Sequence, residues 1–122
     1  MATNFSPSEV YLPVLKRGDT WSLVFRWLQS SGQPIDLTGC EARMQIRHAT
    51  SKKLAAVPDS LIIDIPTGSV TATFLVATTE TVSPGAYLTD MEVVYVDGTV
   101  TSSDTLQIRV AEDITRPAGV GV

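Results

Sequence analysis

Residues 84–110 read PGAYLTDMEVVYVDGTVTSSDTLQIRV, and this stretch decides the fold. From Tyr87 to Tyr95, every second side chain is apolar, aromatic or β-branched, and the intervening positions include Asp90 and Glu92. A two-residue period of this kind is typical of a strand with one buried face. Asp97-Gly98 is a common two-residue hairpin turn. The stretch therefore predicts a long β-hairpin.

The predicted turn also predicts the register of the hairpin, because loop length determines which residues face each other. Three cross-strand pairs follow from it: Tyr95 with Val100, Tyr87 with Ile108, and Met91 with Asp104. The last pair sets an apolar side chain against a carboxylate, so we expect a bulge or a frayed ladder around residues 102–104. A lone hairpin exposes two edges, so the rest of the chain must supply further strands.

Other stretches of the chain show the same alternation. The predicted strands are residues 10–16 (kinked at Pro13), 21–28, 40–47, 54–57, 61–65 and 70–76. The positions expected to face inward are Trp21, Leu23, Phe25, Trp27, Cys40, Ala42, Met44, Ile46, Val70, Ala72, Phe74 and Val76. Residues 77–82 predict a single helical turn with Thr78 as its cap.

These elements predict an all-β fold of seven to nine short strands with no long helix. The spacing is typical of an immunoglobulin-like antiparallel two-sheet β-sandwich. Tyr87 follows a Pro-Gly corner and resembles the tyrosine that ties one corner of such sandwiches.

Length and composition predict one domain. The chain has 122 residues, of which 43% are hydrophobic and 18% charged, so it can bury a core. We expect an N-terminal arm over residues 1–9, the sandwich over 10–113 and a C-terminal tail over 114–122. No apolar run reaches the roughly 18 residues of a membrane span, and residues 1–9 do not read as a secretory signal. We therefore expect a protein made in the cytoplasm.

The net charge of −4 argues against a nucleic-acid partner. Residues 1–58 carry seven basic and four acidic side chains, and residues 59–122 carry two basic and nine acidic ones. Two interpretations remain open. The asymmetry follows from strand order alone, or it makes neighbouring subunits of an assembly complementary.

Few side chains suggest catalysis or metal binding. Cys40 and His48 are the only residues of their kinds, so the chain cannot form an internal disulfide or a Cys/His zinc site by itself, and we expect no cofactor. Asp90 and Glu92 share a strand face and could in principle perform acid–base chemistry, but an outward acidic face is the simpler interpretation. A calcium site would draw on Asp36, Asp97 or Asp104 without any recognisable ligand spacing. Arg17-Gly18-Asp19 matches an integrin-binding tripeptide and is better interpreted as a turn.

The candidate assembly interface consists of basic side chains and the two termini. Its residues are Phe5, Pro7, Arg43, Arg47, Lys52, Lys53, Ile114 and Arg116. The four central residues gather positive charge within a short span, which suits a solvated or protein-facing surface. The polar terminal arms would be ordered by docking onto neighbouring subunits, for example by strand addition, or by folding back on their own domain.

Three stretches together resemble a known family. They are RGDT at 17–20 with the aromatic strand after it, GQPIDLTG at 32–39 running into ARMQIR at 42–47, and PGAY at 84–87 through DGTV at 97–100. They resemble the immunoglobulin-like domain of tailed-phage structural proteins, the family named for the N-terminal domain of the phage baseplate upper protein. The similarity spans roughly residues 14–115. It implies a building block of tails, baseplates and fibre attachments.

The resulting expectation is a non-enzymatic structural protein of a tailed-phage virion, in the tail, baseplate or fibre-attachment region. Its partners would be other virion proteins and further copies of itself, with no nucleic acid and no membrane span. One alternative is a capsid decoration protein. A second is a carbohydrate- or cell-surface adhesion module, which would expose aromatic rings such as Trp21, Trp27 or Tyr87. The third class, a hydrolase, would use Asp90 and Glu92.

Overall fold

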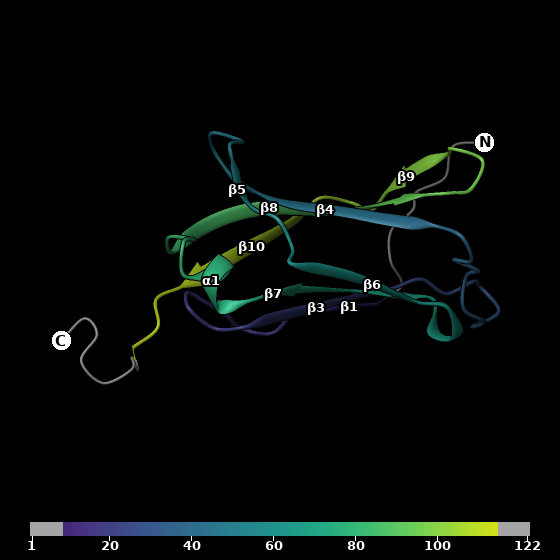
Figure 1. Cartoon of the computed structure of the whole chain (residues 1–122), viewed down its shortest axis with the longest axis horizontal. Helices are drawn as coiled ribbons and strands as arrows, with labels where there is room; N and C mark the ends of the chain where they lie inside the picture. The colour runs from purple at the N-terminus through teal and green to yellow at the C-terminus, as the bar shows by residue number, and fades with distance from the viewer. Residues whose placement is uncertain (1–8, 115–122) are drawn as a thin grey trace.

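The computed structural model describes residues 9–114, which form two packed β-sheets (Figure 1). The first sheet has the order β1-β3-β7-β6, with β1 Glu9–Tyr11, β3 Trp21–Arg26, β7 Ser69–Phe74 and β6 Ser60–Asp64. The second has the order β2-β10-β8-β4-β5, with β2 Leu15–Lys16, β10 Leu106–Ala111, β8 Gly85–Val94, β4 Glu41–His48 and β5 Leu54–Ala56. A further strand, β9 (Val100–Ser102), pairs with β8. The predicted immunoglobulin-like all-β sandwich is confirmed. No helix in the described part is long and apolar enough to cross a membrane.

The first predicted strand, residues 10–16, is divided between the two sheets. β1 pairs antiparallel with β3, and β2 pairs parallel with β10. Pro13 lies between them and has no N–H to donate to a ladder, so the chain changes sheets there. This division, together with the separation of β9 from β10, gives ten described strands instead of seven to nine. Glu9, which was assigned to the arm, belongs to β1 and pairs with Arg26.

The hairpin register is confirmed at one end and wrong at the other. Tyr87 faces Ile108 as predicted, but Val94, not Tyr95, faces Val100. The loop has three residues, because the Tyr95 N–H donates to the Thr99 oxygen at 2.8 Å and the Gly98 N–H donates to the Tyr95 oxygen at 2.9 Å. Gly98 alone in this loop has a positive φ, 89°, as in a turn closed by a glycine bulge.

A bulge absorbs the register difference between the two ends. Glu92 faces Ser102 and Thr89 faces Leu106, so β8 has two residues in this interval while the facing segment has three. The bulge expected around residues 102–104 is confirmed. The predicted pair of Met91 with Asp104 is wrong, because the Ser103 N–H donates to the Met91 oxygen at 2.8 Å.

The core lies between the inner faces of the sheets. Trp21, Leu23, Phe25 and Trp27 are all buried, as their alternation predicts. The second sheet contributes, among others, Ile46, Tyr87, Met91, Val93 and Ile108. Each large apolar side chain removed from water stabilises the fold by about 1.5–3 kcal/mol. Among the predicted inward positions, Cys40 and Ala42 are only half-buried, and Val76 begins a helix and is 45% exposed.

That helix, α1 (Val76–Thr79), is capped from outside its own segment. Its N-cap is Leu75, not Thr78. The carboxylate of Asp59 accepts the Leu75 N–H at 2.7 Å and the Thr78 hydroxyl at 3.0 Å. After the helix, the Tyr87 hydroxyl donates to the Ser83 carbonyl oxygen, which forms the corner tie that its position beside Pro84-Gly85 predicts.

Candidate interaction surfaces

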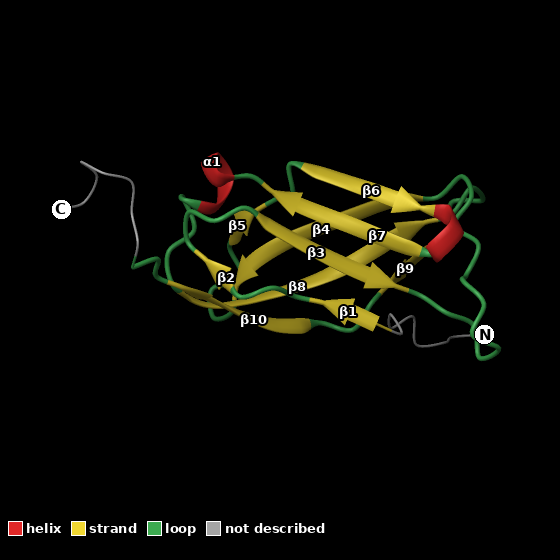
Figure 2. Ribbon diagram, turned by 90° about the horizontal axis from the view of Figure 1, so that it is seen from below, coloured by secondary structure: helices red, strands yellow, loops and turns green. Residues whose placement is uncertain are grey.

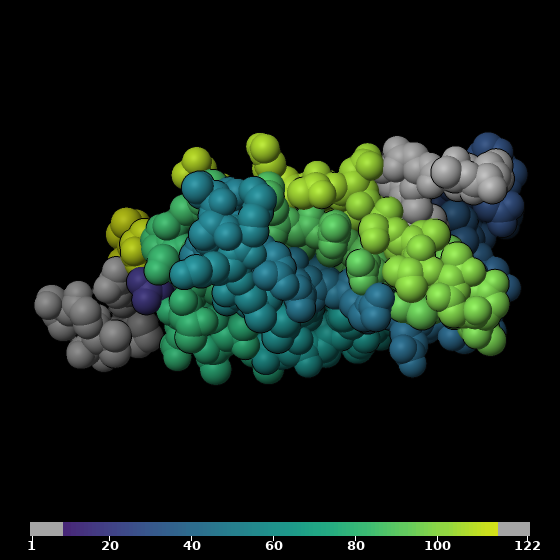
Figure 3. All heavy atoms as spheres, turned by 90° about the horizontal axis from the view of Figure 1, so that it is seen from above, coloured from purple at the N-terminus to yellow at the C-terminus, as the bar shows by residue number. Residues whose placement is uncertain are grey.

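The outer face of the second sheet, viewed in Figure 3, carries most of the predicted interface residues that the structure describes. On β4, Arg43 and Arg47 point outward together with Glu41 and Gln45. On β8, Leu88, Asp90, Glu92 and Val94 occupy the same face. The register places Arg43 opposite Glu92, Gln45 opposite Asp90, and Arg47 opposite Leu88.

Arg43 is paired with an acidic side chain from the other half of the sequence. Its Nη2 lies 2.9 Å from Glu92 Oε1, and its Nε donates to the same oxygen at 3.1 Å. The two side chains are 60% and 37% exposed. At this exposure the pair contributes about 0–1 kcal/mol to the stability of the fold. It also neutralises the positive charge of Arg43 that was expected to bind a partner. The two oppositely charged halves of the chain therefore meet within one domain at this point.

Arg47, Lys52 and Lys53 gather at the β4–β5 hairpin. Arg47 donates to the Lys52 carbonyl oxygen at 3.0 Å and to Gln45 Oε1 at 2.7 Å. Lys52 has a φ of 63° and donates from Nζ to the Ala49 oxygen. The tip is thus held by its own basic side chains, while all three remain exposed to solvent. The structure places Arg43 on the same sheet face but apart from this group.

Asp90 lies on this outer face beside the bulge. A groove of about 320 Å³ is lined there by Gln45, Arg47, Lys52, Leu88, Thr89, Asp90, Glu92 and Thr105. Burial raises the pKa of the Asp90 carboxyl, and the negative charge of Glu92 raises it further. Within residues 9–114, no side chain donates a hydrogen bond to Asp90. Glu92, its supposed catalytic partner, is bound to Arg43.

The terminal interface residues divide between described and undescribed parts of the chain. Phe5, Pro7 and Arg116 lie outside the described residues. Ile114 is described and is 85% exposed. Near Pro13, where the chain passes from the first sheet to the second, Tyr11 and Val14 are also exposed, at 67% and 75%.

The remaining single residues have structural roles. The Asp19 N–H donates to the Lys16 oxygen at 3.1 Å, so residues 17–19 form a tight turn. Asp36 accepts hydrogen bonds from the Thr38 hydroxyl and N–H, which lower its pKa. The His48 ring contacts the Tyr87 ring at a centroid distance of 5.0 Å. Burial raises the pKa of the Cys40 thiol, and Asp36 adds to that effect. No group of three or more potential metal ligands occurs among the described residues.

Sequence reasoning missed a surface along the edge of β4. β4 pairs with β8 from Glu41 to His48, but β5 reaches only Ile46 and Arg47. The chain then leaves the second sheet and enters β6 of the first. On the side away from β8, the segment 41–45 therefore has no neighbouring strand within residues 9–114.

The backbone groups at this edge can be assigned from the flanking hydrogen bonds. The Ala49 N–H donates to the Ala86 oxygen on the β8 side, at 3.2 Å, whereas the His48 N–H donates to the Lys53 oxygen on the β5 side, at 2.9 Å. Alternate residues of a strand direct their N–H and C=O groups to opposite sides. The groups of Ala42 and Met44 therefore face the open edge.

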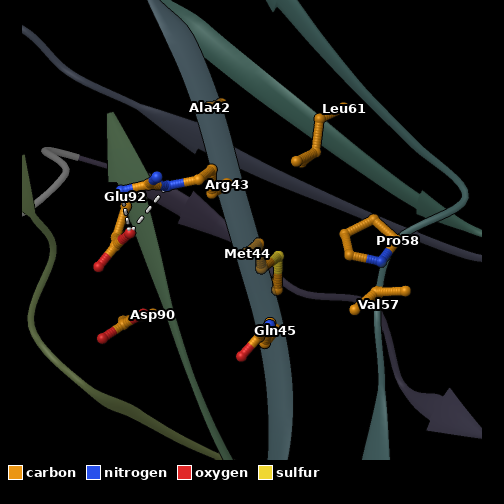
Figure 4. A pocket seen from close by; sticks show the side chains of 9 residues that line it. All are labelled: Ala42, Arg43, Met44, Gln45, Val57, Pro58, Leu61, Asp90 and Glu92. Carbon is orange, nitrogen blue, oxygen red and sulfur yellow. Dashed lines mark hydrogen bonds and ion pairs between the residues drawn. The ribbon is translucent and has the colours of Figure 1, made fainter. Parts of the chain in front are cut away.

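A groove of about 570 Å³ lies along the open edge. Its apolar lining is Ala42 and Met44 of β4, Val57 and Pro58 after β5, and Leu61 of β6, and its polar lining is Arg43, Gln45, Asp90 and Glu92 (Figure 4). Figure 4 shows Val57, Pro58 and Leu61 on one side of β4, while the pair of Arg43 and Glu92 lies on the other. The edge thus combines backbone hydrogen-bonding groups with an apolar wall.

Comparisons with known proteins give similar solved structures at low sequence identity. Neither a family model nor a curated protein matches this sequence. Among solved structures, CopC from Methylosinus trichosporium OB3b is similar with a TM-score of 0.48 and 14% identity, over 89% of this chain and 100% of that chain. The fibronectin type-III domain of human fibronectin type III domain containing protein 3 is similar with a TM-score of 0.40 and 19% identity, over 97% and 98%. These similarities concern the β-sandwich alone.

Proposed function

We propose that this chain is a non-enzymatic structural protein of a tailed-phage virion, where it works as an assembly module in the tail, baseplate or fibre-attachment region. The observation that carries the assembly role is the open edge of β4 beside a groove with one apolar wall. Natural sheets usually cover, shorten or charge such edges, because an open edge pairs with other chains. In a particle, neighbouring subunits would supply the missing partner.

The assignment to a phage particle rests on the resemblance of the three sequence stretches. RGDT at 17–20 forms the turn that leads into β3. GQPIDLTG at 32–39 connects to β4, and PGAY at 84–87 begins β8 at the tyrosine corner. These residues build the turns and the corner of a sandwich, which is the part of the resemblance that fold alone can explain.

The aromatic side chains favour assembly over adhesion. A carbohydrate-binding face would expose aromatic rings, but Trp21, Trp27 and Tyr87 are 0%, 1% and 2% exposed. Asp90 and Glu92 do not support a hydrolase, because they lie on an outward strand face and Glu92 is held by Arg43. Acid–base pairs of glycosidases act on a bond placed between the two carboxyl groups.

The test is to purify particles from a producing culture and to identify their proteins by mass spectrometry, followed by cryo-electron microscopy. We expect the chain in stoichiometric amounts and a two-sheet density of its size at the tail or baseplate. Density on the capsid surface would instead support a decoration protein. Absence of the chain from purified particles would refute a virion role.

A further inference from the structure

We propose that the open edge of β4 accepts residues 1–8 of a second copy of this chain as an added β-strand. This inference rests on the proposed assembly function and names its acceptor surface and its donor segment. The acceptor is the backbone of Ala42 and Met44, together with the apolar wall formed by Val57, Pro58 and Leu61. The donor is the sequence MATNFSPS.

The backbone of the acceptor matches what strand addition requires. Two N–H and two C=O groups, those of Ala42 and Met44, face away from β8. A strand laid along this edge would pair with these groups and continue the second sheet. β5 already covers Ile46 and Arg47, so the available length ends there. The site thus fits a short donor of about five residues, not a complete second sheet.

The side chains of the donor match the wall of the groove. In an extended strand, Thr3 and Phe5 share one face, while Ala2, Asn4 and Ser6 share the other. When Phe5 lies opposite Ala42 or Met44, it points into the groove against Val57 and Leu61. Burial of the aromatic ring against these apolar side chains would stabilise the contact. The outward residues of the donor are uncharged, so they do not compete with the Arg43–Glu92 pair beside them.

The donor must come from another copy. Within one copy, residues 1–8 lead directly into β1, which lies at the edge of the first sheet far from the groove. β1 and β6 are the opposite edges of the first sheet (Figure 2), and the groove lies on the β6 side, since Leu61 lines it. Three strand spacings of about 4.8 Å separate these edges, or about 14 Å. If residues 2–6 pair at the groove, the three steps from residue 6 to Glu9 span only about 10 Å. The connection is too short within one copy.

Each copy therefore donates one segment and accepts another at a different place on its surface. Such head-to-tail contacts make rings when the rotation closes and filaments when it does not. Both are arrangements in which a phage structural protein would work.

The first experiment compares full-length variants by sedimentation over a range of concentrations. Phe5→Asp alters the donor, and Val57→Lys alters the acceptor. The matched controls are Asn4→Asp, which carries the same charge on the other donor face, and Val100→Lys. Val57 and Val100 are 48% and 46% exposed, so both lysines begin from similar surroundings. We expect the test variants to weaken self-association about tenfold or more and the controls less than about threefold, where tenfold corresponds to about 1.4 kcal/mol. Thermal unfolding establishes that all four variants are folded.

The second experiment locates the contact by hydrogen exchange in the wild-type chain. The Ala42 and Met44 amides should exchange rapidly in dilute solution and become protected as concentration rises. A chain that stays monomeric at millimolar concentration would overturn the proposal. So would protection of these amides that does not depend on concentration, because it would mean that the edge is covered within one copy.

A third experiment remains informative if a groove variant does not fold. Cys40, the only cysteine, lies directly before the edge segment of β4. Thr3→Cys and Pro7→Cys place a thiol on the same donor face as Phe5, one on either side of it, and the one that crosslinks to Cys40 when Phe5 lies opposite Ala42 reveals the strand direction. In mixtures of tagged and untagged copies, we expect disulfides between copies, and disulfides within one copy only would contradict the donor assignment. These outcomes concern the contact alone, whereas particle composition tests the proposed function.

Discussion

The Ser103 hydroxyl oxygen accepts the N–H of Met91 at 2.9 Å, while the Ser103 N–H donates to the Met91 oxygen at 2.8 Å. One residue of the bulge thus satisfies both backbone groups of Met91, which is fully buried. A side chain replaces the carbonyl that a regular ladder would have supplied. The bulge is therefore a bonded feature of the hairpin.

Ser103→Ala should destabilise the fold by about 1–3 kcal/mol, because it leaves a buried N–H without an acceptor. The measurement is urea unfolding followed by tryptophan fluorescence. Ser102→Ala is the control, since Ser102 is exposed and its hydroxyl makes only a 3.4 Å contact with Glu92. A loss no larger than that of the control would mean that water or a backbone shift satisfies Met91.

Gly68→Ala should destabilise the fold more than Gly32→Ala. Both glycines have a positive φ, 66° and 89°, so alanine is strained at either position by roughly 1–2 kcal/mol. A Cβ on Gly68 would also lie 2.8 Å from the Trp27 carbonyl oxygen, whereas one on Gly32 meets nothing within 4 Å. We expect a total loss of about 2–4 kcal/mol at Gly68. Equal losses in thermal unfolding would show that the backbone near Trp27 moves aside easily.

Asp90→Asn should stabilise the fold at pH 7, and the gain should vanish at low pH. Burial and the charge of Glu92 raise the folded-state pKa of Asp90 above the ordinary value of 3.8. The folded state therefore favours the protonated carboxyl, and this stability is complete below pH 3.8 and is lost as the pH rises through the folded-state pKa.

At neutral pH the charged carboxylate of Asp90 destabilises the folded state, and substitution with Asn removes that charge. Because the side chain is partly exposed, we expect a gain of about 0.5 kcal/mol, measured by urea unfolding between pH 3 and pH 7. Asp97→Asn is the control of opposite sign, since hydrogen bonds from Thr99 lower the pKa of Asp97. A gain for Asp90→Asn that does not change with pH would rule out this explanation.

Arg43→Glu should weaken association with neighbouring subunits while changing stability by about 1 kcal/mol or less. The exposed pair with Glu92 contributes little to folding, but the substitution sets two negative side chains beside the groove. Incorporation into particles, or self-association of the purified chain, is the measurement. Arg109→Glu is the control, because Arg109 is exposed on β10. Association that survives Arg43→Glu unchanged would remove this face from the interface.

Several features of the fold could be predicted because they depend on neighbouring residues. The alternation from Trp21 to Trp27 identified a buried strand face, and the poor partner of Met91 indicated a bulge. The turn at residues 96–98 was wrong by one residue, because Asp97 accepts the Thr99 N–H and does not adopt a positive φ. The cap of α1 could not be found locally, since it comes from Asp59.

The candidate surface was predictable in part. The sequence indicated that Arg43 and Arg47 share an outward face, but it could not indicate that Glu92 neutralises Arg43. That pairing depends on the register of β4 with β8. The open edge of β4 was missed altogether, because a strand pattern looks the same whether or not a second strand lies beside it.

By itself, the sequence determined which side chains are buried and therefore that two sheets pack face to face, because period-two alternation is a property of each strand alone. Only the tertiary structure decided that β5 stops short, that Ala42 and Met44 direct backbone groups to an open edge, and that Leu61 closes the groove. These are relations between segments distant in the chain. They depend on the point at which the chain leaves one sheet for the other, which no local pattern of side chains specifies.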